Sequence, residues 1–395
     1  MKKKIVIIVF IFIWFSFNIL SIDFNYGGYY NNFISYIPKN NLNEKSDGFL
    51  NQKLRLNFDT QITEAVKFYF SYELLGLINR SSNFLKNVES VSYRVSDIRK
   101  RIYPHNIKEA GSFTLNQNID RGYIKYYLPH ADIYLGRQAI SWGSGHIINP
   151  TDIFFSFSFA DFEKEERPGV DGLRIRIPLG MMSEIDIGGV FGRDFNIDNS
   201  GYFSRFKFYI KKTDIFLILI NFKNNFLYGF DITRAIGDYG FWYEMAVVEN
   251  NKFTDIKPNE SSYYRISTGL DYNISSKLYT IIEYHYNSCG VNDSQYYYNL
   301  LNKESYNEGS VYLLGENYFN LIMSYQLFPL ISWQTTILWN INDGSTGLLP
   351  SLEYNIAENI YISGGGNFYL DLYKSGVKEF DYYEDLFYTG IKIYF

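Results

Sequence analysis

The feature that most constrains the fold is an alternation of polar and apolar residues that returns along nearly the whole chain. In KLRLNFD (53–59), charged or polar residues alternate with Leu54, Leu56 and Phe58. Successive side chains of a β-strand point to opposite faces, so this period of two predicts strands, and helical periodicity is nearly absent. The alternation recurs in AVKFYFSYEL (65–74), RGYIKYYL (121–128), GLRIRIPL (172–179), EIDIGGVF (184–191), FSRFKFYI (203–210), YYRISTGLDY (263–272), TIIEYHY (280–286), NYFNLIMSYQL (317–327), SWQTTILWN (332–340) and FYTGIKIYF (387–395).

The connections between these segments alternate between short and long. Turn residues predict short connections near Thr63, Pro129-His130, Gly180, Lys212-Thr213, Gly237-Asp238, Ser275-Ser276, Pro329-Leu330 and Ala357-Glu358. The longer polar connections are 78–117, 142–168, 250–260, 289–315 and 371–383. Short turns at one end and long loops at the other are typical of transmembrane β-barrels, and segments of about 9 to 12 residues can cross a bilayer.

We therefore predict an all-β fold in which residues 22–395 form one transmembrane antiparallel β-barrel of about 18 strands. Its first strand falls in 22–33 and its last in 385–395. A count of 16 stays open in case the first strand or the weak segment 347–356 does not form. A secreted soluble sandwich or solenoid is the alternative fold, but its open edges would favour aggregation.

The first residues predict export. Lys2, Lys3 and Lys4 precede the apolar run IVIIVFIFIWF, and a small residue, Ser21, follows it. A basic start, an apolar run of this length and a small residue describe a signal peptide over residues 1–21, removed in the mature protein. An uncleaved anchor helix is the alternative, although the run is shorter than the ~20 residues that span a bilayer.

Composition narrows the classes of partner. Aromatic residues make up 19% of the chain, and such side chains with one polar end suit membrane interfaces. The formal net charge of −5 and the lack of a basic block argue against nucleic acid as a partner. The single cysteine, Cys289, cannot form an internal disulfide, and no metal-ligand spacing occurs. We expect neither metal nor cofactor.

The polar faces of the predicted strands carry a set of basic residues that we expect to line a pore. They are Lys53, Arg55, Lys67, Arg121, Lys125, Arg174, Arg176, Arg205 and Lys207. Placing Arg or Lys against lipid costs about 2–4 kcal/mol near the bilayer midplane, so these side chains should face water. On the same faces, only Asp59, Glu73, Glu184 and Asp186 are acidic. The remaining strands give a mixed lumen with Glu244, Arg265, Asp271, Glu283, Gln334 and Lys392.

One strand pattern is apolar on both faces. DIFLILINF (214–222) is too short for a membrane helix. We expect a strand whose inner side is packed, at a subunit contact or under a loop.

The connection 142–168 is the candidate constriction loop. It opens with Trp142-Gly143-Ser144-Gly145, where glycine permits a sharp turn, and continues into Asn149-Pro150-Thr151-Asp152. Its acidic residues, if the loop folds inward opposite the basic residues, would create a transverse field; a solvated loop is the alternative. The acidic residues are Asp152, Asp161, Glu163, Glu165 and Glu166. A phosphate-binding loop is disfavoured because no helix follows, and Ser144 with His146 lacks the GxSxG spacing of a nucleophile turn.

Two stretches resemble known families. The final strand, with Phe387, Ile391, Ile393 and terminal Phe395 on one face, resembles the C-terminal signature of Gram-negative outer-membrane barrels. Residues 136–152, with GRQ, WG and NPTD, resemble the GRQ…WG…NPxD region of uncharacterised porin-like families and, more loosely, of alginate-export porins. In general porins, the loop after the fifth strand is folded inside to narrow the pore, and 142–168 follows the fifth predicted strand.

The resemblance and the charged lumen together predict a diffusion channel for small hydrophilic solutes, with a modest preference for anions, in the outer membrane of a diderm bacterium. Expected partners are outer-membrane lipid, small solutes or ions, and the assembly machinery acting on Phe395; an oligomer stays open. The alternatives are a surface adhesin or structural barrel using loops 78–117 and 289–315, and a barrel hydrolase, for which His146 and His285 would be tested. No arrangement of catalytic residues stands out, so we expect no enzyme.

Overall fold

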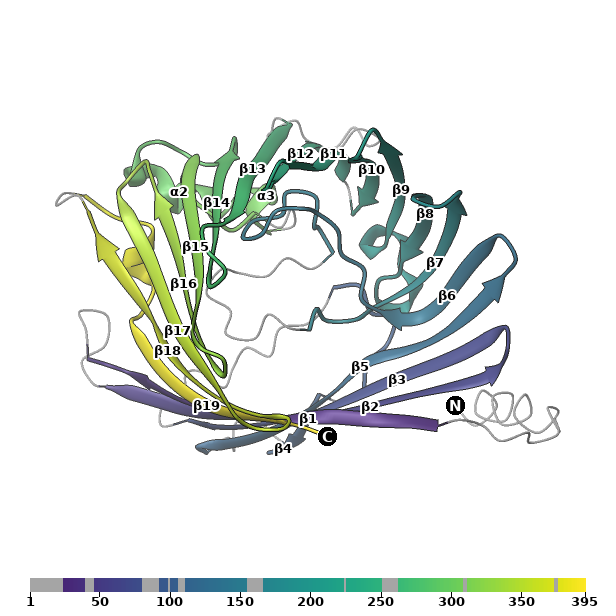
Figure 1. Cartoon of the computed structure of the whole chain (residues 1–395), viewed down its shortest axis with the longest axis horizontal. Helices are drawn as coiled ribbons and strands as arrows, with labels where there is room; N and C mark the ends of the chain where they lie inside the picture. Colours follow the sequence, from purple (N-terminus) through teal and green to yellow (C-terminus); the bar gives the residue numbers. More distant parts are fainter. Residues whose placement is uncertain are drawn as a thin grey trace.

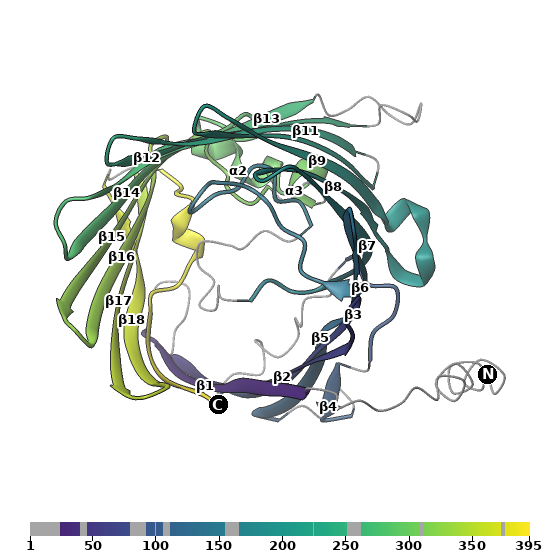
Figure 2. The same ribbon diagram turned by 45° about the vertical axis from the view of Figure 1, so that its right-hand side comes forward.

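The strands form one antiparallel sheet that closes on itself into a barrel (Figures 1 and 2). The computed structural model describes residues 24–39, 46–79, 92–98, 100–105, 111–154, 166–223, 225–250, 262–307, 311–372 and 376–395. The predicted signal peptide, residues 1–21, lies outside the described residues. The chain therefore has the all-β barrel fold that its alternation predicts.

Eighteen strands form the wall, and β4 is a short additional strand. The strands are β1 (Phe24–Ile37), β2 (Asp47–Thr63), β3 (Val66–Asn79), β4 (Arg101–Tyr103), β5 (Phe113–Leu128), β6 (Ala131–Gln138), β7 (Val170–Leu179), β8 (Ser183–Val190), β9 (Gly201–Ile210), β10 (Thr213–Phe222), β11 (Asn225–Ile236), β12 (Tyr239–Asn250), β13 (Tyr263–Asn273), β14 (Leu278–Asn287), β15 (Asn317–Phe328), β16 (Ile331–Asn340), β17 (Ser345–Ala357), β18 (Ile360–Asp371) and β19 (Leu386–Tyr394).

The prediction of 18 strands is confirmed, and the alternative of 16 is wrong. The weak segment 347–356 lies inside β17, which pairs with β16 and β18. The predicted first strand, in 22–33, overlaps β1, which runs four residues further than expected, to Ile37. The strands vary more in length than the sequence suggests, from 8 residues in β6 to 17 in β2.

The barrel closes where its first and last strands meet. β1 pairs with β19 in an antiparallel ladder that runs from Tyr29–Tyr394 to Tyr36–Phe387. Beyond it, the Gly28 N–H donates to the Phe395 carbonyl (2.9 Å) and the Phe395 N–H donates to the Gly28 carbonyl (3.0 Å). Closure leaves no unpaired sheet edge to face lipid.

The two faces of the wall differ in character. On β10, Leu217 and Leu219 are exposed on the outer face, whereas Ile218 and Ile220 are at most 1% exposed. The outer face has the apolar residues that lipid requires. The inner apolar side of β10 packs under a chain segment that follows β6, which agrees with the second of the two expectations for residues 214–222.

Beyond the end of β6, the gap in the wall between β5 and β7 is filled by residues from the β3–β5 connection. We call residues 92–98 and 100–103 the insert segment. β4 pairs with β5 at Asn116 and Leu115, beyond the point where β6 stops pairing with β5. At its other end, the Asp171 N–H of β7 donates to the Tyr93 carbonyl (2.9 Å). The insert segment thus links β5 to β7 where β6 has left the sheet.

In the part of the chain that the structure describes, helix is confined to short turns in the connections between strands, among them α2 (Tyr297–Leu300) and α3 (Glu304–Asn307). Within the described ranges, every helix is too short or too polar to span a membrane.

Two of the long connections, 289–315 and 371–383, meet the short β16–β17 connection at a buried carboxylate, that of Glu379. It accepts hydrogen bonds from the Leu314 N–H (2.8 Å), Tyr318 Oη (2.5 Å) and Asn340 Nδ2 (2.7 Å). The Glu379 N–H donates to Asp343 Oδ2 (2.8 Å). Burial and the neighbouring Asp343 raise the pKa of Glu379 to about 7, against the hydrogen bonds from its three donors.

Candidate pore constriction

The chain leaves the wall after β6 and enters the barrel. We call residues 139–154 the inner segment. Figures 1 and 2 show this part of the chain crossing the inside of the ring toward β11–β14. Gly136 and Gly143 adopt φ of +121° and +112°, a backbone region that L-residues with a side chain rarely enter. The Trp-Gly-Ser-Gly turn at the strand end therefore redirects the chain inward.

Glu244 of β12 holds the inner segment at two points, Ser144-Gly145 and Thr151. Its carboxylate accepts hydrogen bonds from the backbone N–H groups of Ser144 (3.0 Å), Gly145 (2.9 Å) and Thr151 (2.8 Å). Thr151 Oγ1 donates a fourth at 2.7 Å. Glu244 is fully buried, so these donors replace the water that its carboxylate would otherwise bind.

Glu283 of β14 holds the next turn in the same way. It accepts hydrogen bonds from the N–H groups of His146 (2.7 Å), Ile147 (3.5 Å) and Ile148 (3.1 Å). Asn320 Nδ2 of β15 lies 3.4 Å from the same carboxylate. Two buried carboxylates from the wall thus fix the backbone of residues 144–151, and hydrogen bonds to charged groups are the stronger kind.

The glycines of the turn are required by this close approach. A Cβ on Gly143 would lie 2.6 Å from Asn149 Oδ1 and 2.7 Å from Glu244 Oε1. A Cβ on Gly145 would lie 2.4 Å from the Ile148 carbonyl oxygen. The Gly-Ser-Gly sequence therefore lets the backbone bring its N–H groups against Glu244.

Apolar side chains of the inner segment pack on the inner face of the wall. Trp142, Ile153 and Phe154 are buried with Ile218 and Phe203 in one cluster. The Trp142 ring lies 4.8 Å from that of Phe203, in an edge-on arrangement. Burial of this apolar surface and the two carboxylates hold the segment against the same side of the barrel, β9–β14.

Ser267 and His285 lie beneath the inner segment and are fully enclosed. Ser267 Oγ donates to the Ile148 carbonyl (2.7 Å) and lies 2.8 Å from His285 Nδ1. Because the Ser267 proton goes to Ile148, Nδ1 of His285 must carry the proton of the second bond. A proton-bearing nitrogen cannot act as a base toward that hydroxyl.

Ser144 and His146 make separate contacts. Ser144 Oγ donates to Asp231 Oδ1 of β11 (2.5 Å). The His146 ring packs edge-on against Trp242 of β12, with 4.5 Å between ring centroids. Burial lowers the pKa of His146, opposed by the charge of Asp271, so the ring is neutral at pH 7. These contacts position the inner segment.

Each of the nine predicted pore-lining basic residues forms an ion pair. The N···O distances are Lys53–Glu73 3.0 Å, Arg55–Glu73 2.7 Å, Arg55–Asp120 2.8 Å, Lys67–Asp59 2.7 Å, Arg121–Asp120 2.6 Å, Lys125–Asp132 2.9 Å, Arg174–Asp186 2.6 Å, Arg176–Glu184 2.5 Å, Arg205–Glu184 3.8 Å and Lys207–Asp214 2.9 Å. The inner faces of β2–β10 therefore hold a ladder of paired charges. Three of the acids, Asp120, Asp132 and Asp214, are not among the four that alternation predicts on these faces.

Of the five acidic residues predicted in the constriction loop, two are described. Asp152 is buried and forms an ion pair with Arg167. Glu166 lies within 3.4 Å of Arg55 and 3.5 Å of Arg121, so it contacts the basic residues directly. Asp161, Glu163 and Glu165 lie outside the described residues, as does the middle of the predicted loop, 155–165.

Arg137, the arginine of the GRQ sequence, ties the insert segment to the wall. It donates to Asp171 Oδ1 (2.7 Å), Asp97 Oδ1 (2.9 Å) and the carbonyls of Ile119 (2.9 Å) and Ser96 (2.6 Å). Next to it, Arg94 Nε donates to the Gly169 carbonyl (3.0 Å), and the Tyr93 ring lies 5.2 Å from that of Phe154. The insert segment thus contacts both ends of the chain that runs between β6 and β7.

Comparison with solved structures places the fold among outer-membrane porins. The chain is similar to the outer membrane protein opdK of Pseudomonas aeruginosa (TM-score 0.58, 7% identity), covering 94% of this chain and 98% of that one. It is similar to OccAB4 of Acinetobacter baumannii (0.57, 9%, covering 95% and 97%) and to P. aeruginosa OccK2 (OpdF) in complex with glucuronate (0.55, 11%, covering 94% and 98%).

At these identities, the likeness shows the fold. The chain has the closed barrel of outer-membrane porins. No family model matches the sequence, and no curated protein matches it either.

Proposed function

We propose that this protein is a diffusion channel for small hydrophilic solutes in the outer membrane of a diderm bacterium, and that the inner segment forms its constriction. The observation that carries the proposal is the fixing of residues 144–151 by Glu244 and Glu283 inside a closed barrel. A channel that selects by size needs a narrow part with a fixed shape, and buried carboxylates bonded to backbone N–H groups supply one.

The charged inner face supports the same function, because a ladder of ion pairs needs water beside it. The nine basic residues meet eight carboxylates, those of Asp59, Glu73, Asp120, Asp132, Glu166, Glu184, Asp186 and Asp214. Because the positive and negative charges nearly balance, we propose only a weak preference for anions. It is smaller than the preference that the nine basic residues would give without the carboxylates. The glucuronate bound by OccK2 makes sugar acids suitable anionic probes.

Three further proposals concern assembly and family. The exposed Phe395 side chain is available to the outer-membrane assembly machinery. Self-association into an oligomer fits a barrel with an apolar outer face. The resemblance of residues 136–152 to the GRQ…WG…NPxD region fits the present roles of those residues, since Arg137 closes the wall and Gly143 permits the inward turn.

Planar-bilayer conductance of the refolded protein, with reversal potential under a KCl gradient, tests the proposal. We expect stable stepwise openings and a small anion-biased reversal potential. A demonstrably folded barrel that conducts no ions would overturn the channel and favour the adhesin alternative. Hydrolysis of ester or peptide substrates that is lost on replacing His146 would instead favour the hydrolase.

A further inference from the structure

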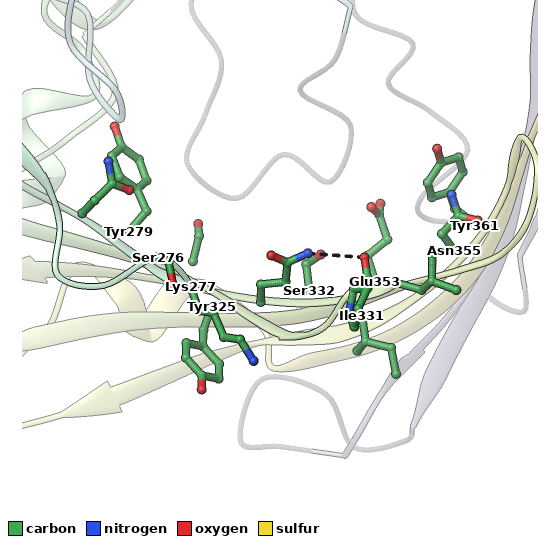
Figure 3. A pocket seen from close by; sticks show the side chains of 14 residues that line it. Ser276, Lys277, Tyr279, Tyr325, Ile331, Ser332, Glu353, Asn355 and Tyr361 are labelled. Carbon is green, nitrogen blue, oxygen red and sulfur yellow. Dashed lines mark hydrogen bonds between the residues drawn. The ribbon is translucent and has the colours of Figure 1, made fainter.

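A second polar site lies on the wall at the short-turn end of the barrel, away from the inner segment. It is a cavity of about 430 Å³ between the short-turn ends of the β13–β14, β15–β16 and β17–β18 hairpins (Figure 3). Its volume is within the range of small-ligand sites. Residues that line it include Asn273, Tyr279, Gln326, Glu353, Asn355 and Tyr361.

Strand register places these side chains on the luminal face. Ser332 lies directly opposite Glu353, and Asn355 opposite Tyr361, so each pair shares a face. On β14, Tyr279 precedes Glu283 by an even number of residues, and Glu283 holds the inner segment inside the barrel. A solute that passes the inner segment therefore meets this cavity before it leaves at the short-turn end.

The chemistry of the cavity differs from that of the ion-pair ladder. Its polar groups are mostly uncharged amides and hydroxyls, which both donate and accept hydrogen bonds. Figure 3 shows Glu353 and Tyr279 directed into the open space above the strands, whereas Lys277 extends to the other side. Within the described part of the chain, Glu353 forms no ion pair, unlike each of the nine basic residues of the ladder.

We propose that this cavity is a subsite for a neutral sugar, an inference that rests on the proposed channel function. Neighbouring sugar hydroxyls can donate two hydrogen bonds to one carboxylate, that of Glu353, and the amide and hydroxyl groups of the wall satisfy the others. The rings of Tyr279 and Tyr361 supply apolar surface for the C–H face of the sugar. A sugar acid would place a second negative charge near Glu353, so the subsite discriminates against it.

Block of the ion current by glucose and by glucuronate tests this inference, because the two solutes differ by one carboxylate. Each is added in turn to either side of single channels of the whole protein, at matched ionic strength. We expect half-block at a concentration at least about 5-fold lower for glucose than for glucuronate. The Glu353→Gln variant should bring the two concentrations to within about 2-fold, and Tyr279→Ala should weaken glucose block about 5-fold.

Matched controls separate the subsite from general effects at this end of the barrel. Glu358→Gln changes a carboxylate in the adjacent turn, and Tyr354→Ala removes an exposed tyrosine from the opposite face of β17. Both should keep the glucose preference of the parent protein.

Equal block by the two sugars in the parent, or a preference unchanged in folded Glu353→Gln, would overturn the subsite. A polyethylene glycol of the same size that blocks as well as glucose would do the same. Absence of current in every variant would instead overturn the channel function.

Discussion

Glu244 and Glu283 lie on β12 and β14, and each accepts backbone hydrogen bonds from a different turn of the inner segment. Replacing both with alanine removes these acceptors and leaves buried N–H groups unpaired. Each such group costs about 1–3 kcal/mol, so the double variant should release the segment. We expect single-channel conductance to change by about 2-fold or more and current noise to rise. The Glu64→Ala variant, in the β2–β3 turn, is the control, and an unchanged conductance in the double variant would contradict this role.

Gly143 tests whether the close approach to Glu244 is needed. Alanine at this position combines a φ of +112° with a Cβ within 2.8 Å of both Glu244 carboxylate oxygens. Gly180 provides a matched control, because it has a φ of +73° with nothing within 4 Å of its Cβ position. Gly180→Ala therefore carries backbone strain alone, about 1–3 kcal/mol. Gly143→Ala should therefore change the unfolding temperature and the conductance more than Gly180→Ala does. Equal changes in the two variants would argue against a steric contact with Glu244.

Arg137 should contribute most to holding the insert segment. Its guanidinium is buried and donates to Asp97, Asp171 and two backbone carbonyls. Removing one partner of a buried ion pair costs about 3–5 kcal/mol, so Arg137→Ala should lower the unfolding temperature and expose residues 92–98 to protease. Lysine cannot reproduce the several donors and should rescue only partly. Arg234→Ala, whose side chain is on the exposed β11–β12 end, should leave both readouts unchanged.

The ion-pair ladder makes selectivity depend on pairs and not on single residues. Neutralising Arg174 and Arg176 leaves Asp186 and Glu184 without their nearest partners. We expect the reversal potential under a KCl gradient to move toward cation preference, with a change of about 2-fold in permeability ratio at low salt. Adding Asp186→Asn and Glu184→Gln should restore the original value. If the variants that lack both partners of each pair show the same reversal potential as the arginine variants, selectivity does not depend on the ion pairs.

The cluster at Glu379 should loosen as the pH rises. Its pKa in the folded protein is about 7, above the ordinary value of 4.5, so the folded state binds this proton more tightly than the unfolded state does. The stabilisation is complete below pH 4.5 and is lost as the pH rises through 7. Amide exchange at Leu314 should therefore quicken between pH 5 and pH 8, beyond its intrinsic dependence on pH. The Glu379→Gln variant should lose this additional pH dependence of amide exchange at Leu314, and the Glu358→Gln variant should keep it.

The strands could be predicted because their signals are local. Alternation and turn residues act over a few positions, and they gave nearly all wall strands, including β17 despite Pro350. Asp120 shows where this reasoning stops. A register shift between β3 and β5 pairs Arg121 with Ser71 and Ile119 with Tyr72, so Asp120 is an extra residue there. Strict alternation puts Asp120 and Arg121 on opposite faces, yet they form an ion pair.

Asp132 and Asp214 could have been found. Each follows a predicted tight turn and alternates with a luminal residue, Tyr134 and Phe216 respectively. Alternation predicts Glu244 and Glu283 in the lumen, but it does not identify the groups that bond to them. Backbone N–H groups occur at almost every residue, so no sequence pattern marks those that a carboxylate will bind.

The insert segment has a consequence for the order in which the barrel is assembled. Its residues precede β5, β6 and β7 in the chain, yet they fill the wall between β5 and β7 where β6 has departed. The hydrogen bond between Tyr93 and Asp171 must wait until β7 is in place. The insert segment therefore docks on the wall after strands that follow it in the chain. Closure of this side is a late event with a long-range contact, the kind that slows folding.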